Sequence, residues 1–235
     1  VATELTPDTL QALDSQQVNT NAYYQSDLTG KDVGRVLRRE PTNLTADEQV
    51  VFDRYLDTRD DKAEILGRLA EHAGTPWAKQ AVEGVFTREA MLMLMRGDEP
   101  NFQSSLDSKQ VAKLRGSLER GTEGMWSYLE ATGGMMGHAS KPVNNVNSSF
   151  INCNPSRDCA QYCYATQGNY RYANVLVKSE MITMAIELDP VRAATVVARE
   201  YKATAEYANK KALRLFDKGD GDAKWLPFIE ALNNQ

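Results

Sequence analysis

The residues best suited to chemistry in this chain are three cysteines that lie within one short stretch. Cys153, Cys159 and Cys163 are the only cysteines among the 235 residues, and their spacing is C-x5-C-x3-C. An odd number of cysteines cannot pair completely within one chain, which disfavours a secreted scaffold built on disulfide bonds. Thiolates are ligands for soft metals, and a bound metal keeps the thiol deprotonated. The clustering therefore predicts a loop that can wrap one metal centre.

The residues alone leave three interpretations of this cluster open. A structural zinc ion takes four ligands, and His138, which precedes the first cysteine by fifteen residues, would supply the fourth. An iron–sulfur cluster held by three cysteines would instead leave one iron open for a substrate or cofactor. Cysteine is also common as a small buried hydrophobic residue, in which case the three thiols bind no metal.

The elements that must position this loop begin with helices, as the spacing of apolar residues and the caps indicate. Five start signals divide the first part of the chain: Thr6-Pro7, Thr45, Asp60-Asp61, Thr75-Pro76 and Asp107-Ser108. Thr45 and Glu48 have the spacing of a capping box, and the last signal is followed by apolar residues at helical spacing as far as Leu129. We therefore predict a helical domain over residues 1–132. Glycine, serine and asparagine then predict a linker over residues 133–148.

After the linker the pattern changes to short apolar stretches that alternate with helices. The expected order is strand, helix, helix, strand and helix, over residues 146–152, 174–188, 190–209, 212–216 and 224–232. The run DKGDGD, residues 217–222, follows the second strand as a tight acidic turn, which suits a helix cap as well as a cofactor contact. The prediction is an α-helical N-terminal domain followed by a partial α/β (β-α-α-β-α) C-terminal domain over residues 149–235, predominantly helical overall.

Composition and charge exclude several classes of protein. The net charge is −5 and 42% of the residues are hydrophobic, which is ordinary for a globular protein. No apolar run approaches the ~20 residues that cross a bilayer. Lysine and arginine form no basic face, so charge does not indicate a nucleic-acid partner. With two histidines and no nucleophile-elbow motif, a histidine-dependent hydrolase is disfavoured. Because the chain begins VATELTP, without Met, we expect a processed or excised piece.

The stretch CAQYCYA, which begins at Cys159, resembles the cysteine loop of radical S-adenosylmethionine enzymes. Those enzymes place an aromatic residue directly before their third cysteine, where Tyr162 stands here. Their second motif is a glycine and acid turn after the next strand, which holds the amino group of S-adenosylmethionine. The matching residues here are Gly219, Asp220, Gly221 and Asp222. The resemblance implies a 4Fe–4S cluster on the three cysteines, although their spacing is wider than usual and the segment is too short for a complete barrel.

A closer resemblance is to a phage family known as gene product eighty-eight. That family has a cysteine, a C-x3-C-Y-A block, a strand, an acidic glycine turn and a tryptophan, in this order. Here these are Cys153, CAQYCYA, the run RLFDKGD from Arg214 to Asp220, and Trp225. The resemblance covers about residues 140 to 235 and implies a phage or mobile-element protein, located in the host cytoplasm or associated with the virion.

Two hypotheses follow. In the first, the protein has a cysteine-ligated iron–sulfur site, and the residues Gly219 to Asp222 with Tyr162 contact S-adenosylmethionine, which supplies the radical chemistry. No substrate-side catalytic residue can be nominated, so whether the protein is an enzyme stays open. In the alternative, the protein is non-enzymatic: a zinc ion on the three cysteines and His138 staples the fold, and the helical domain binds other phage proteins.

Overall fold

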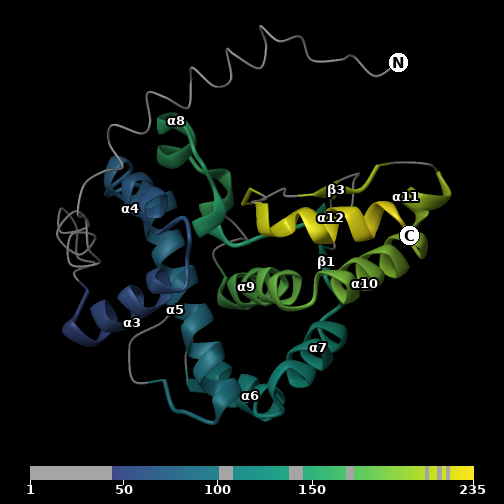
Figure 1. Cartoon of the computed structure of the whole chain (residues 1–235), viewed down its shortest axis with the longest axis horizontal. Helices are drawn as coiled ribbons and strands as arrows, with labels where there is room; N and C mark the ends of the chain where they lie inside the picture. The colour runs from purple at the N-terminus through teal and green to yellow at the C-terminus, as the bar shows by residue number, and fades with distance from the viewer. Residues whose placement is uncertain are drawn as a thin grey trace, which may run out of the picture.

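The computed structural model describes residues 44–100, 108–137, 145–167, 172–209, 212–215, 219–220 and 223–235. This part of the chain is predominantly helical, with one small sheet near its C-terminal end (Figure 1). The α-helices are α3 (Ala46–Asp57), α4 (Lys62–Glu71), α5 (Pro76–Arg96), α6 (Ser108–Leu118), α7 (Gly121–Ala131), α8 (Arg157–Gln161), α9 (Ala173–Leu188), α10 (Pro190–Lys202), α11 (Ala205–Ala208) and α12 (Leu226–Asn233). The 3-10 helices are η2 (Phe150–Asn152), η3 (Tyr164–Thr166) and η5 (Ala223–Trp225). The strands are β1 (Met136–Gly137), β2 (Asn145–Val146) and β3 (Arg214–Leu215).

The helices α3 and α5 begin where their cap residues predict. Thr45 and Glu48 form the complete capping box of α3, because the Glu48 carboxylate accepts from the Thr45 backbone at 2.7 Å. Thr75 caps α5, and Pro76 occupies its first turn, where a missing N–H costs nothing. The predicted start at Thr6-Pro7 lies outside the described residues.

The helix predicted from Ser108 to Leu129 is two helices, α6 and α7. The chain turns between them at Gly121, whose φ of +63° suits glycine alone. The two helices then pack closely, because a Cβ at Gly124 would lie 1.8 Å from the carbonyl oxygen of Ser117. The apolar spacing concealed this break, since Leu118 and Met125 enter the same hydrophobic cluster from the two separate helices.

The sheet is much smaller than predicted: β3 lies within the strand predicted over 212–216, β2 shares only Val146 with the strand predicted over 146–152, and β1 lies in the predicted linker. β1 pairs antiparallel with β2, and β2 pairs parallel with β3, with Val146 opposite Leu215. Most of the stretch predicted as a strand over 146–152 is not a strand, and it contains η2, which the Ser149 side chain caps. From β2 to α12 the elements still follow the predicted β-α-α-β-α order, with the short helices α8 and α11 and short 3-10 turns added. The predicted fold class is therefore confirmed.

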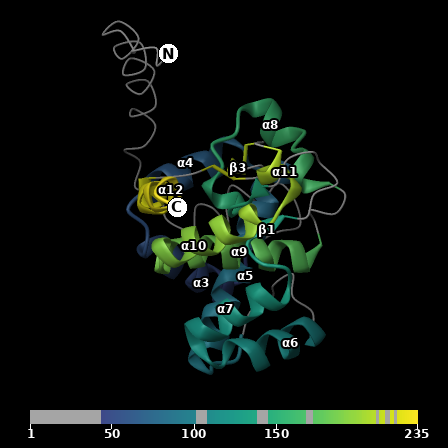
Figure 2. The ribbon, with the colours of Figure 1, turned by 90° about the vertical axis from the view of Figure 1, so that its right-hand side faces the viewer.

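The buried apolar residues form two clusters, and α5 contributes to both. The cysteine-side cluster combines α3, α4 and the first part of α5 with later residues from η2, the stretch that contains the cysteines and the start of α9. Its largest members include Phe52, Leu69, Trp77 and Phe150. The distal cluster combines the last part of α5 with α6, α7, α9, α10 and α12; its members include Met91, Leu118, Met125, Ile186 and Phe228. Figures 1 and 2 show α8 on the side of α4, away from α6 and α7. Both clusters draw residues from before and after the predicted linker, whose role as a domain boundary stays a prediction.

The described start of that predicted linker is held by two side chains, one from α9 and one from α10. The Glu200 carboxylate accepts hydrogen bonds from the backbone N–H groups of Met135 and Met136, each at 3.0 Å. Lys178 Nζ donates to the Met136 carbonyl at 3.2 Å. Residues 135 and 136 are thus fixed to α9 and α10. None of the helices in the described ranges is long and apolar enough to span a membrane.

Candidate functional site around the cysteine segment

Residues 150–167, here called the cysteine segment, are built from short helical turns that local side chains cap. Ser149 caps η2, and Cys153 follows as its last cap residue. The Ser156 hydroxyl then accepts from Cys159 N at 3.2 Å and starts α8. α8 is only five residues long, and the chain continues into η3 after Cys163. Ala160 and Ala165 in these turns are buried in the cysteine-side cluster.

The three thiols lie in different environments within this segment. None of them is in a disulfide bond; Cys153 is partly buried, Cys159 is exposed, and Cys163 is only 7% exposed in the cysteine-side cluster. Among the described residues, no three His, Cys, Asp or Glu side chains are grouped closely enough to hold one metal ion. The donor chemistry therefore suits a soft metal, whereas the arrangement of the three sulfur atoms in this structure does not. His138 lies outside the described residues.

The second predicted motif contacts the cysteine segment. Gly219 has a φ of +75°, and a Cβ there would lie 1.9 Å from Ser148 Oγ and 2.6 Å from the Ser149 carbonyl oxygen. Only glycine fits this approach. The Asp220 carboxylate accepts from the backbone N–H of Asn154 at 2.7 Å. Two motifs separated by about sixty residues in the sequence thus meet directly, although Gly221 and Asp222 lie outside the described residues.

Tyr162 is the remaining predicted contact of a cofactor. It is the cap residue at the C-terminal end of α8, and its side chain is 74% exposed, next in sequence to the buried Cys163. Tyr164 and Tyr172 are also about half exposed nearby in the sequence. The tyrosines therefore lie at the surface of this region, and the role of Tyr162 in binding a cofactor stays a prediction.

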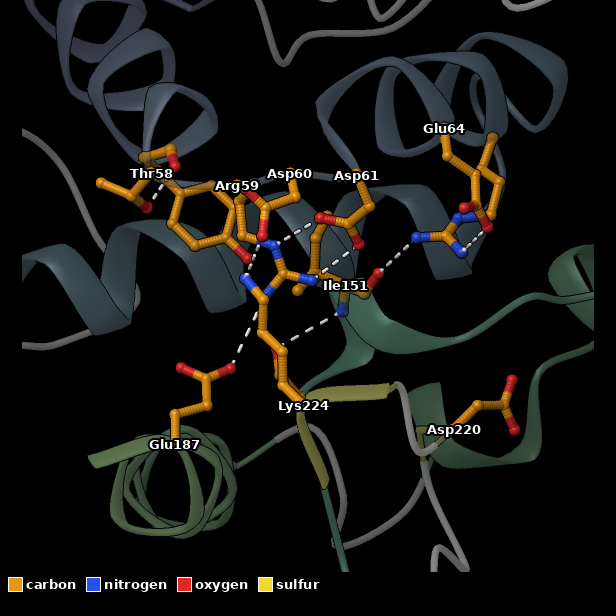
Figure 3. Close-up of polar contacts among 12 residues, drawn as sticks. Thr58, Arg59, Asp60, Asp61, Glu64, Ile151, Glu187, Asp220 and Lys224 are labelled. Carbon is orange, nitrogen blue, oxygen red and sulfur yellow. Dashed lines mark hydrogen bonds and ion pairs between the residues drawn. The ribbon is translucent and has the colours of Figure 1, made fainter. Parts of the chain in front are cut away.

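Two helices that precede the cysteines hold the backbone of η2. Trp77 Nε1, from α5, donates to the Phe150 carbonyl at 3.1 Å. Arg68 Nη2, from α4, donates to the Ile151 carbonyl at 3.2 Å, while its Nη1 pairs with Glu64 at 2.9 Å (Figure 3). Both bonds to the backbone are buried. The cysteine segment, which has little regular structure of its own, is therefore fixed from outside.

A group of buried charges lies beside this segment, and sequence reasoning missed it. Arg59, between α3 and α4, binds Asp61 through two hydrogen bonds at 2.8 and 2.7 Å and lies 3.6 Å from Glu187 of α9 (Figure 3). Arg88 also pairs with Glu187, and both guanidinium groups lie within 6 Å of the Tyr55 ring centroid. Burial raises the pKa of Tyr55, so its hydroxyl stays protonated. In the sequence these residues look like ordinary helix-surface charges.

Comparisons with known proteins give one result. A family model described as Gene product 88 matches residues 105–226, just over half of the chain. No curated protein and no solved structure matches the chain. The matched range contains all three cysteines and the Gly219-Asp220 turn, but not Arg68 or Trp77. This chain belongs to the Gene product 88 family of phage proteins.

Proposed function

We propose that this phage protein binds a metal ion or metal cluster through Cys153, Cys159 and Cys163, with the Gly219-Asp220 turn as part of the same site. The observation that carries the proposal is the hydrogen bond from Asn154 N to the Asp220 carboxylate. It joins the two stretches of sequence that resemble a cofactor-binding pair of motifs. Three thiols within eleven residues are a donor set that suits zinc or an iron–sulfur cluster.

The negative charge of Asp220 would attract a positively charged amine at the proposed site. Its carboxylate is exposed and accepts one backbone hydrogen bond, so it retains lone pairs for another donor. A positively charged amino group, such as that of S-adenosylmethionine, would suit this position. An iron–sulfur cluster with one open iron would supply the radical chemistry of such a cofactor. Gly221, Asp222 and Tyr162 are included in this proposal because they complete the motif.

Because the three thiols lie apart, their binding to one metal centre would require a local rearrangement of the cysteine segment. Cys159 is exposed on α8, whereas Cys163, four residues later and outside that helix, is buried. A helix of five residues has few internal hydrogen bonds, so its conformation is readily changed by metal–thiolate bonds, which are much stronger. The exposed thiol of Cys159 should therefore become protected from alkylating reagents when the metal binds.

The test is anaerobic reconstitution of the whole chain with iron and sulfide, in parallel with zinc. An iron–sulfur protein should turn brown and absorb near about 400 nm. The matched controls are the single variants Cys153→Ser, Cys159→Ser and Cys163→Ser, each of which should lose the metal. Stoichiometric zinc that depends on His138 would instead support a non-enzymatic, zinc-stapled protein that acts by binding other phage proteins. A chain that retains neither metal would show that the proposal is wrong.

A further inference from the structure

Two adjoining cavities lie between α7 and α10, the helices that Figures 1 and 2 show close together. The first, here called the polar cavity, has a volume of about 320 Å³ and is lined mainly by polar groups of the two helices. The second, the apolar cavity, has about 330 Å³ and extends past β1 to the end of α10. They share Glu130, Gly134 and Glu200 as lining residues. Sites for small molecules have about 300–1,000 Å³, so each cavity suits a small ligand or part of one.

The polar cavity is lined by acidic side chains of α7 and basic side chains of α10. Glu123 of α7 pairs with Arg192 of α10 through two hydrogen bonds, at 2.5 and 3.0 Å. Glu130 and Arg199 each lie seven residues later, two turns further along the same two helices. Both line the polar cavity, but within the described part of the chain their side chains form no ion pair with each other or with another residue. One pair of opposite charges is therefore closed, and the corresponding pair is open.

The other polar groups of this wall differ in whether they have partners. The Glu200 carboxylate already accepts from the backbone N–H groups of Met135 and Met136. Trp126 also lines the polar cavity and is only 6% exposed, but its indole N–H has no partner among the described residues. A buried indole N–H usually has an acceptor. The wall thus combines a carboxylate, a guanidinium and an indole donor that the described protein leaves unused.

We propose that these cavities bind a small zwitterion, an α-amino acid with an apolar side chain. The Arg199 guanidinium, whose planar fork matches a carboxylate, binds its carboxylate, and the Trp126 N–H is a further donor to the same group. The Glu130 carboxylate accepts from its ammonium group. The side chain of the ligand occupies the apolar cavity. A zwitterion fits the open pair because an amine alone would leave Arg199 without a partner, and an anion alone would leave Glu130 without one. This site lies outside the cysteine segment and does not depend on the proposed function.

The first experiment uses the wild-type chain and three probes in isothermal titration calorimetry. The probes are L-leucine, 3-methylbutylamine, which lacks the carboxylate of leucine, and 4-methylpentanoate, which lacks its amino group. L-leucine should bind at least about tenfold more tightly than either analogue, because each analogue leaves one charged group of the site without its partner. The absence of L-leucine binding at millimolar concentration, or an analogue that binds as tightly as L-leucine, would overturn the proposal.

The second experiment assigns the two ends of the ligand. Arg199→Gln should weaken binding of L-leucine and 4-methylpentanoate about tenfold and leave 3-methylbutylamine unaffected, and Glu130→Gln should weaken L-leucine and 3-methylbutylamine instead. Trp126→Phe should follow the pattern of Arg199→Gln. The matched controls are Arg120→Gln and Glu119→Gln, which remove the same charges from exposed positions outside both cavities and should leave all three affinities unchanged. Equal weakening of all three probes by Arg199→Gln and Glu130→Gln would overturn the assignment, because it would indicate a general effect on the fold.

Discussion

Trp77 in the cysteine-side cluster and Trp126 in the distal cluster are both buried, but they make different contacts. At the cysteine end, the indole N–H of Trp77 donates to the backbone of η2. In the distal cluster, Trp126 is also buried, but its N–H has no partner within the described part of the chain. The guanidinium of Arg192 lies 4.5 Å from the centroid of its ring. The first tryptophan fixes a loop, and the second fills a space between helices.

This difference extends to the surroundings of each tryptophan. The distal cluster is formed mainly by helices, whose backbone bonds are satisfied internally, so its side chains need only pack. The cysteine-side cluster must also hold a segment of short turns, and it does so with buried side-chain donors from α4 and α5. A region with little secondary structure thus depends on polar contacts from helices that lie far away in the sequence.

Removal of α3 to α5 should have the largest effect, because it takes residues from both clusters. A fragment of residues 105–235 would lose Phe86, Met91 and Leu94, among many others. Each large buried apolar side chain contributes about 1.5–3 kcal/mol, against a total stability of about 5–15 kcal/mol for a typical domain. We expect the fragment to show no cooperative thermal transition by circular dichroism, whereas residues 44–235 should melt cooperatively. A cooperative fragment would instead show that the residues after α5 fold without the helices before them.

Gly219→Ala should destabilise the protein more than Gly97→Ala, the corresponding change at the glycine that ends α5. Gly219 and Gly97 both have positive φ values, +75° and +82°, so alanine costs about 1 kcal/mol at each through backbone strain. Only Gly219 is also crowded, and overpacking adds about 1–3 kcal/mol. Urea unfolding of Gly219→Ala and Gly97→Ala should show this difference. Equal midpoints would mean that the turn does not lie against Ser148 in solution.

Trp77→Phe and Trp126→Phe should separate the two tryptophans. Both keep an aromatic ring in the core, but only the first removes a hydrogen bond that the structure shows. We expect Trp77→Phe to lower the free energy of unfolding by about 1 kcal/mol more than Trp126→Phe does. Chemical denaturation measures the difference. The reverse order would indicate that Trp126 makes the more important contact.

The smallest effect on stability is expected from protonation of Asp61 at low pH. Burial alone would raise the pKa of Asp61, but the hydrogen bonds and charge of Arg59 outweigh it and lower the pKa below its ordinary value. A carboxyl group whose pKa is lowered by folding stabilises the protein above its unfolded pKa, and this contribution is lost as the pH falls below about 4. Stability should therefore decline less steeply between about pH 4 and pH 2 in Asp61→Asn than in the wild type. Parallel declines would contradict the pairing with Arg59.

Local signals in the sequence predicted the helices well. Caps such as Thr45 and Thr75 act within one turn, so no distant partner is needed to recognise them. The break between α6 and α7 was missed because a helix pair and a single helix share the same apolar spacing. The strands were overestimated because a two-residue pairing between β2 and β3 depends on contacts some seventy residues apart, which local alternation cannot show.

The candidate site was predictable in its parts but not in its assembly. The cysteines and the glycine–aspartate turn are visible in the sequence, and their order suggested that they meet. The supports are not visible: Arg68 and Trp77 reach backbone carbonyls 83 and 73 residues away, and Arg88 pairs with Glu187 across 99 residues. Carbonyl groups carry no sequence signature, so a donor to one of them cannot be recognised by residue type.

The close approach at Gly219 has a consequence for how the sequence can vary. The hydrogen atom of Gly219 faces a backbone carbonyl at Ser149 as well as the Ser148 side chain, so no substitution at position 148 would make room for a larger residue. Space could come only from displacement of the chain that leads into Cys153. Position 219 therefore acts as a spacer of fixed size between two loops. A related protein with a side chain at this position should have its first cysteine in a different place relative to the acidic turn.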